Sequence, residues 1–109
     1  MNDRELLEMA AKVVGIEISG FSVSAFGVMV ERSDGGWWDP LDDDGDAFRL
    51  AAYLRLEVIP GKHAGDGCSV NSRRHEIPGV TVFRDSKDMA EQMRRGIVMA
   101  AAEIGKSMP

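Results

Sequence analysis

An α+β fold, in which a short and mainly antiparallel sheet carries helices on both faces, is the architecture that the sequence predicts. Apolar residues repeat at helical spacing near both ends of the 109-residue chain, over residues 2–15 and 89–104. Between them lie short apolar runs that Gly and Pro separate, as in a set of short strands. Because each apolar helix face must be buried against the strands, an α-β-α sandwich follows, and a two-layer α/β sandwich is the alternative.

A capping box opens the first predicted helix, since Asn2 is followed three residues later by Glu5. Gly15 stands where a left-handed C-cap belongs. We therefore expect this helix to end at Gly15. Its apolar stripe consists of Leu6, Met9, Ala10 and Val13.

Residues 16–32 predict two strands, one short and one longer, because Ile, Val, Phe and Ser dominate the segment. The portion from Phe26 to Val30 is apolar at both alternating sets of positions. Strands with two apolar faces are typical of the inside of a covered sheet. We expect this portion to be covered on both sides.

A stretch rich in tryptophan and aspartate, Gly35 to Asp46, joins these strands to a second predicted helix. Pro40 fixes its own backbone and keeps Asp39 extended. The aspartates that follow suit a helix N-terminus, where carboxylates accept hydrogen bonds from free amides. The spacing of the next apolar residues predicts a helix from about Asp46 to Leu56, with Phe48 and Tyr53 at the margins of its apolar face.

Residues 57–84 predict three short strands, connected as an antiparallel meander around a polar, glycine-rich loop. The C-terminal helix has the clearest pattern, a stripe at i, i+3 and i+4 over five turns. Asp85 or Ser86 can cap its start, and Gly105 can close it. The stripe contains Met89, Ala90, Met93, Ile97, Ala100, Ala101 and Ile104.

Composition places the chain among single-domain globular proteins, with one domain over residues 1–109. The net charge of −5 argues against nucleic-acid binding, which depends on clustered Lys and Arg. Cys68 is the sole cysteine, so an intramolecular disulfide is excluded. The sequence shows neither a secretory signal nor an apolar run long enough to span a membrane, which leads us to expect a cytoplasmic protein.

The acidic run resembles a calcium loop in composition only. An EF-hand with its glycine at Gly45 would begin at Pro40 and end at Ala51, where ligand carboxylates are required. A cation site weaker than an EF-hand, formed by Asp42, Asp43 and Asp44, remains as a metal-binding hypothesis. Helix capping and solvation are the competing explanation for the same three residues.

Other chemistry has little support in the sequence. His63, Cys68 and His75 could ligate a soft metal, but their spacing matches no zinc motif, and Cys68 is better explained as a small buried apolar residue. The glycine-rich loop lacks the spacing of a nucleotide-binding motif. We therefore assign no catalytic residue and no cofactor from the sequence.

Two features suggest contacts with another chain. Met99 lies beside the apolar stripe of the C-terminal helix, so a wide apolar face could contact a second subunit, although a broad core-facing stripe is the favoured explanation. Trp37 and Trp38 are adjacent, and an extended segment points them to opposite sides. If Trp38 anchors the turn in the core, Trp37 is exposed and available to a partner.

Several motifs resemble the phage α-β-α sandwich domain family, small proteins encoded by bacteriophages and prophages. They are the Trp38-Asp39-Pro40-Leu41 motif, the segment from Asp44 to Ala51, and the C-terminal segments from Arg94 to Val98 and from Ala100 to Gly105. The family has Asn at the position of Asp39 and runs almost directly from the first helix to the Trp motif. Phe21 to Arg32 would therefore be an insertion. The resemblance implies a fold and a phage origin, and it implies no reaction.

Two functional hypotheses follow from the sequence. The first is a non-enzymatic phage accessory protein that binds a phage or host protein, or forms a homodimer, through Trp37, Trp38 and Met99. The second is a small metal-dependent hydrolase that uses the carboxylates of Asp42 to Asp46, with His63 or His75. The acidity, the methionine-rich helix and the lack of a catalytic motif favour the first.

Overall fold

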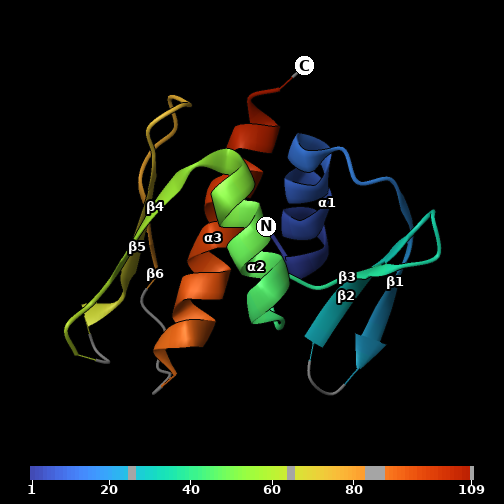
Figure 1. The fold of residues 1–109 in the computed structure, drawn as a ribbon, viewed down its shortest axis with the longest axis horizontal. Coiled ribbons are helices and arrows are strands. Elements are labelled where there is room, and N and C mark those ends of the chain that lie inside the picture. Colours follow the sequence, from blue (N-terminus) through green and yellow to red (C-terminus); the bar gives the residue numbers. More distant parts are fainter. Residues whose placement is uncertain (25–26, 64–65, 83–87, 109) are drawn as a thin grey trace.

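The computed structural model describes residues 1–24, 27–63, 66–82 and 88–108, and within them three helices and six short strands form one α+β unit (Figure 1). The predicted α+β class and the antiparallel pairing of the strands are both confirmed. The elements in chain order are α1 (Asp3–Val14), β1 (Ile18–Ser24), β2 (Gly27–Arg32), β3 (Trp37–Trp38), α2 (Asp44–Leu54), β4 (Leu56–Pro60), β5 (Cys68–Ser72), β6 (Val80–Val82) and α3 (Met89–Lys106).

The strands divide into two three-stranded sheets, where the sequence suggested one. The first has the order β1-β2-β3, and Val30 of β2 pairs with Trp38 of β3. The second has the order β4-β5-β6, with Val70 of β5 paired to both Val58 and Val80. The short strand β3 leads into Pro40 and then α2, and the helices lie between the two sheets (Figure 1).

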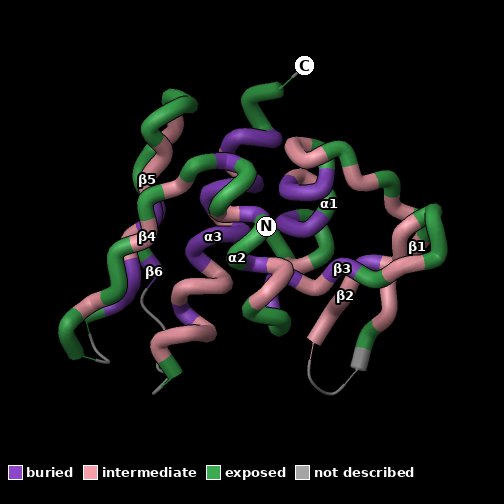
Figure 2. Tube along the Cα trace, viewed as in Figure 1, coloured by how far each residue is buried: buried purple, intermediate pink, exposed green. Residues whose placement is uncertain are grey.

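Helix α3 runs through the middle of the molecule, and its residues from Gly96 to Gly105 are mostly buried (Figure 2). On one side it packs against the β4-β5-β6 sheet through the cluster of Cys68, Val70, Val80, Val82 and Ala100. On the other side it faces α1, α2 and the β1-β2-β3 sheet through a larger core. That core includes Leu7, Ala10, Val30, Trp38, Leu50, Leu54, Ile97, Val98 and Ile104.

Small residues let the neighbouring elements approach α3 closely. A Cβ atom on Gly96 would lie 2.8 Å from a methyl carbon of Val70 in β5. A Cβ atom on Gly105 would lie 2.9 Å from the carbonyl carbon of Met9 in α1 and closer still to its oxygen. Glycine is therefore required for backbone contact between α1 and α3, and helix propensity is given up at that point.

The helix ends follow capping rules, with shifts from the predicted boundaries. The Asn2 side chain accepts a hydrogen bond from the Glu5 amide, and Gly15 adopts the left-handed conformation, as predicted. Asp43 caps α2, so that helix begins at Asp44 and ends at Leu54. Asp88 caps α3, while Asp85 and Ser86 lie outside the described residues. The helix continues through Gly105 to Lys106, because Gly105 serves the contact with α1.

The expectation that Phe26 to Val30 is covered on both sides is wrong for the described part. Phe26 lies outside the described residues, and within β2 only Val30 is buried. The side chain of Val23 in β1 is 70% exposed. The sheet packs on the core through one face, where α1 contacts β1 and β2. Within the described ranges, no helix combines the length and apolar character that crossing a bilayer requires.

The close approach of α1 and α3 predicts that Gly105→Ala is destabilising even though alanine favours helices. The added methyl group would meet the Met9 backbone, which cannot move without displacing α1, and we expect a loss of about 2 kcal/mol in the free energy of unfolding. Urea denaturation measures this loss. Gly45→Ala in α2 is the control, because its methyl group would meet side-chain atoms of Arg49 and Asp43 at 3.3 Å instead of the backbone of another helix, and it should change the free energy of unfolding by less than about 1 kcal/mol. Equal effects at the two sites would contradict the proposed packing role of Gly105.

Candidate functional site: the tryptophan turn and the α2–α3 groove

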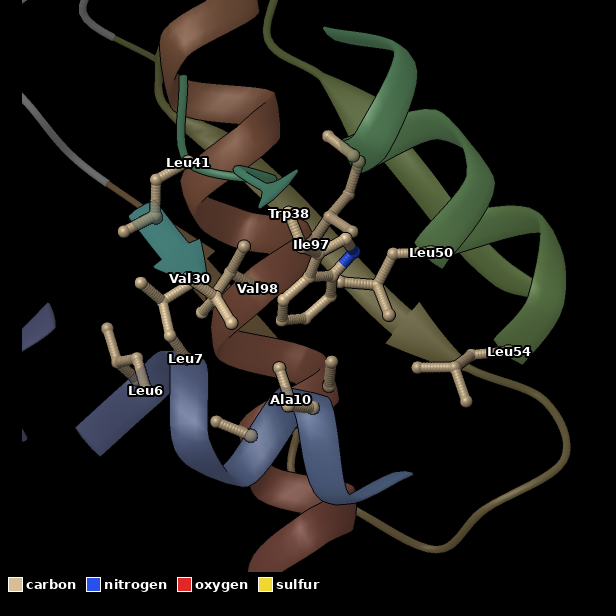
Figure 3. Close-up of a cluster of buried hydrophobic side chains, with 14 of the residues drawn as sticks. Leu6, Leu7, Ala10, Val30, Trp38, Leu41, Leu50, Leu54, Ile97 and Val98 are labelled. Atoms are coloured by element: carbon tan, nitrogen blue, oxygen red, sulfur yellow. The ribbon is translucent and has the colours of Figure 1, made fainter. Parts of the chain in front are cut away.

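The two adjacent tryptophans point to opposite sides, as predicted. Trp38 is buried, and in Figure 3 its indole ring lies in the core with Leu50 on one side and Val98 on the other. Trp37 is 57% exposed. The turn after β3 is therefore anchored from inside by Trp38, and Trp37 remains at the surface.

Arg94 of α3 fixes the other end of this turn. Its Nε donates a hydrogen bond of 2.9 Å to the carbonyl oxygen of Leu41, and one terminal nitrogen donates to an Asp44 carboxylate oxygen at 2.6 Å. A second terminal nitrogen lies 4.0 Å from Asp88. The planar guanidinium can make these contacts together, because its donors have fixed directions. One largely buried side chain thus connects the turn to the N-termini of both α2 and α3.

The acidic residues of the turn have separate structural roles. Asp43 accepts a hydrogen bond from the Asp46 amide at 2.8 Å as the N-cap of α2. Asp44 pairs with Arg94, and Asp46 accepts from both the Asp39 amide and Arg49. Asp42 is exposed, and its carboxylate lies beside Gly27. The candidate cation ligands Asp42, Asp43 and Asp44 are thus directed to different neighbours.

The other candidate metal ligands are also apart. Cys68 is buried between β5 and α3, and burial raises the pKa of its thiol, which disfavours the thiolate that binds metals. His63 and His75 lie exposed outside the strands. In the part of the chain that the structure describes, no three His, Cys, Asp or Glu side chains are grouped so that they could hold a metal ion.

Asp39 has the most perturbed carboxyl group of the turn. Burial, together with the nearby charges of Asp42 and Asp46, raises the pKa of Asp39 from 3.8 to about 6. One of its carboxylate oxygens is buried and has no hydrogen-bond partner among the residues that the structure describes. A proton on Asp39 would relieve this arrangement by allowing a hydrogen bond to Asp42. The group can therefore bind or release a proton near pH 6.

An apolar groove of about 450 Å³ lies between α2 and α3, next to the tryptophan turn. Phe48 of α2 stands beside it with 74% of its surface exposed. Asp44, Gly45 and Arg94 complete the lining. The apolar residues of the groove are Ala47, Phe48, Ala90, Met93 and Ile97.

The sequence did not single out Phe48 as a site residue, and it indicated no contact between Arg94 and the tryptophan turn. Phe48 lies at the margin of the apolar face of α2, which indicates exposure but not a groove. The groove also requires the docking of α2 against α3, which residue spacing within one helix does not reveal. Met99, the third predicted contact residue, is half-buried and packs against both core clusters, as the core-facing alternative predicts.

Comparison with protein-family models, with curated proteins and with solved structures finds no match. The resemblance to the phage α-β-α sandwich family therefore depends on the sequence motifs alone.

The raised pKa of Asp39 predicts a specific pH dependence of stability. The folded protein binds this proton more tightly than the unfolded chain does. The resulting stabilisation of the folded state is fully present below about pH 4 and is lost as the pH rises through about 6. Asp39→Asn has no charge to bury, so its stability relative to the parent should increase by about 1 kcal/mol between pH 4 and pH 7, after allowance for solvent screening. Urea denaturation across this range measures the difference.

Asp34→Asn is the control for this pH dependence. A hydrogen bond from the Gly36 amide lowers the pKa of Asp34, so its contribution to stability is present above the ordinary carboxyl pKa and is lost in acid. The stability of this variant relative to the parent should therefore stay nearly constant between pH 4 and pH 7 and should rise as the pH falls below about 4, which is opposite in sign to the change for Asp39→Asn. A stability difference between Asp39→Asn and the parent that stayed the same at every pH would contradict the raised pKa of Asp39.

Proposed function

We propose that the protein is a phage- or prophage-encoded accessory protein of the host cytoplasm, and that it acts by binding another protein without catalysing a reaction. The observation that supports this most directly is the exposed Phe48 ring beside the apolar α2–α3 groove. The phage origin comes from the sequence resemblance in the tryptophan motif. The partner is a phage protein, a host protein or a second copy of this chain.

The groove has the character of a binding surface. An aromatic ring with this degree of exposure leaves apolar area in water, and contiguous exposed apolar surface commonly marks an interaction site. Aromatic side chains beside a pocket are frequent energetic anchors of protein interfaces. The groove also has firm walls, because Ile97 is part of the main core and Met93 packs against the β4-β5-β6 sheet. A partner would meet a preformed surface.

The carboxylates of the turn favour this proposal over a metal-dependent hydrolase. Hydrolysis with a bound metal requires several ligands that converge on one point and leave a position for water. Asp43, Asp44 and Asp46 instead direct their oxygens to an amide, to Arg94 and to Arg49. Capping and ion pairing account for these three residues without a metal.

Site-specific photo-crosslinking tests the proposal in the cells that normally express the gene. A photoreactive phenylalanine analogue in place of Phe48 should give a discrete crosslinked product with a second protein chain, because the exposed ring is the expected contact. The analogue at Trp37 tests the other exposed aromatic in the same way. Mass spectrometry of the products identifies the partner, including a second copy of this chain.

Val23 is the matched control position, since it is similarly exposed but belongs to β1 and does not line the α2–α3 groove. We expect the discrete product from Phe48 and its absence from Val23. The proposal would be refuted if Phe48 gave no crosslink, or only the same background products as Val23.

A further inference from the structure

We infer that the tryptophan turn, residues 37–46, is a pH-sensitive switch that is closed while Asp39 and Asp42 share a proton and opens more readily once that proton is lost. In the closed state Asp39 keeps the backbone hydrogen bonds that connect β3 to the start of α2. Three observations support this switch: those hydrogen bonds, the carboxylates around Asp39, and the partners of the nearby arginines. The switch belongs to the protein alone and does not depend on the proposed function.

The backbone of Asp39 closes the turn. Its amide donates a hydrogen bond of 2.9 Å to a carboxylate oxygen of Asp46 in α2. Its carbonyl oxygen accepts hydrogen bonds from the amides of Asp42 at 3.2 Å and Asp43 at 2.7 Å. Asp43 is also the N-cap of α2, and Trp38, the residue before Asp39, is anchored in the core. The conformation of Asp39 therefore determines how β3 meets α2.

The side chain of Asp39 lies among other carboxylates. One of its oxygens is buried, and no residue that the structure describes donates a hydrogen bond to it. Burial and the neighbouring charges of Asp42 and Asp46 raise the pKa of this carboxyl group to about 6. The side chain of Asp42 is within hydrogen-bond reach, so these two groups titrate as a pair.

The arginines that border the turn in the described structure are directed to other carboxylates. The ion pairs are Arg32 of β2 with Asp34, Arg49 of α2 with Asp46, and, from α3, Arg94 with Asp44 and Arg95 with Asp3. Glu91 of α3 adds a further acidic group, because it lines the same hollow as Asp42. A proton is therefore the positive charge that can compensate Asp39 without breaking one of these pairs.

One proton changes the interaction between Asp39 and Asp42 from repulsion to attraction. A protonated carboxyl group donates a hydrogen bond, and the carboxylate beside it accepts. When the proton leaves, two negative charges face each other, and Asp39 is better hydrated if it moves out to water. That movement breaks the backbone hydrogen bonds that the same residue makes. Because the closed turn binds the proton more tightly than the open turn, closure is favoured in acid and weakens as the pH rises through about 6.

NMR titration of the full chain from pH 4 to pH 8 tests the switch. The carboxyl carbon signal of Asp39 should titrate with a midpoint near pH 6, and the amide signals of Asp42 and Asp43 should shift with the same midpoint. Hydrogen exchange of these two amides, corrected for the intrinsic pH dependence of exchange, reports opening of the turn. We expect the protection of both amides to be at least about threefold greater at pH 5 than at pH 7.

Three variants make the test specific to the carboxyl pair. Asp39→Asn should remove the pH dependence of the amide shifts and of the protection, because the amide side chain binds no proton in this range. Asp42→Asn should move the midpoint of Asp39 below 6, because the second carboxylate is absent. Asp34→Asn is the matched control, since its carboxyl group belongs to the turn before β3, and it should leave the midpoint of Asp39 unchanged.

Three results would overturn the inference. The first is a midpoint for Asp39 close to its ordinary value of 3.8. The second is an unchanged midpoint in Asp42→Asn, because the proton would then not be shared. The third is exchange of the Asp42 and Asp43 amides only through global unfolding at both pH values, because the turn would then not open by itself. Crosslinking from Phe48 tests the proposed function separately, and its outcome does not depend on these results.

Discussion

The burial of the C-terminal half of α3, between α1 and the β4-β5-β6 sheet, is the constraint on which the rest of the structure depends. A helix in this position must present small residues to its neighbours, and α3 does so with Gly96, three consecutive alanines from Ala100 to Ala102, and Gly105. Helix α1 and strand β5 approach its backbone closely at these small residues. Residues of α3 belong to both core clusters, one on each side of the helix. The two sheets do not pair with each other, so α3 is what joins them.

The same constraint positions the surface features. Where α3 leaves the core toward its N-terminus, its residues become larger and partly exposed, and Met93 and Ile97 form one wall of the groove. Arg94, on the same turns, holds the tryptophan turn and the start of α2 against this wall. The pKa of Asp39 is raised because the turn buries its carboxyl group close to the carboxylates of Asp42 and Asp46. The groove therefore has firm walls, and its charged lining is the ion pair of Arg94 with Asp44 at the start of α2.

Features that depend only on residues nearby in the sequence could be predicted correctly. The capping box at Asn2, the left-handed Gly15 and the opposed tryptophans could all be predicted because each depends on neighbours within a few residues. The division into two sheets could not be predicted from strand patterns, which do not state which strand is a neighbour. Gly105 has the same sequence signature as a C-cap, and only the position of Met9 shows that it is a packing glycine. Arg94 and Phe48 acquire their roles from contacts between helices that are distant in sequence.

Native-state hydrogen exchange of the α3 amides tests this account most directly, because it reports which hydrogen bonds open only when the whole protein unfolds. The amides from Gly96 to Ile104 should exchange only through global unfolding, with opening free energies equal to the value from urea denaturation. Those of β1, an edge strand with exposed Val23, should open at lower free energy. If the α3 amides exchanged as readily as those of β1, α3 would not be the element that joins the two sheets.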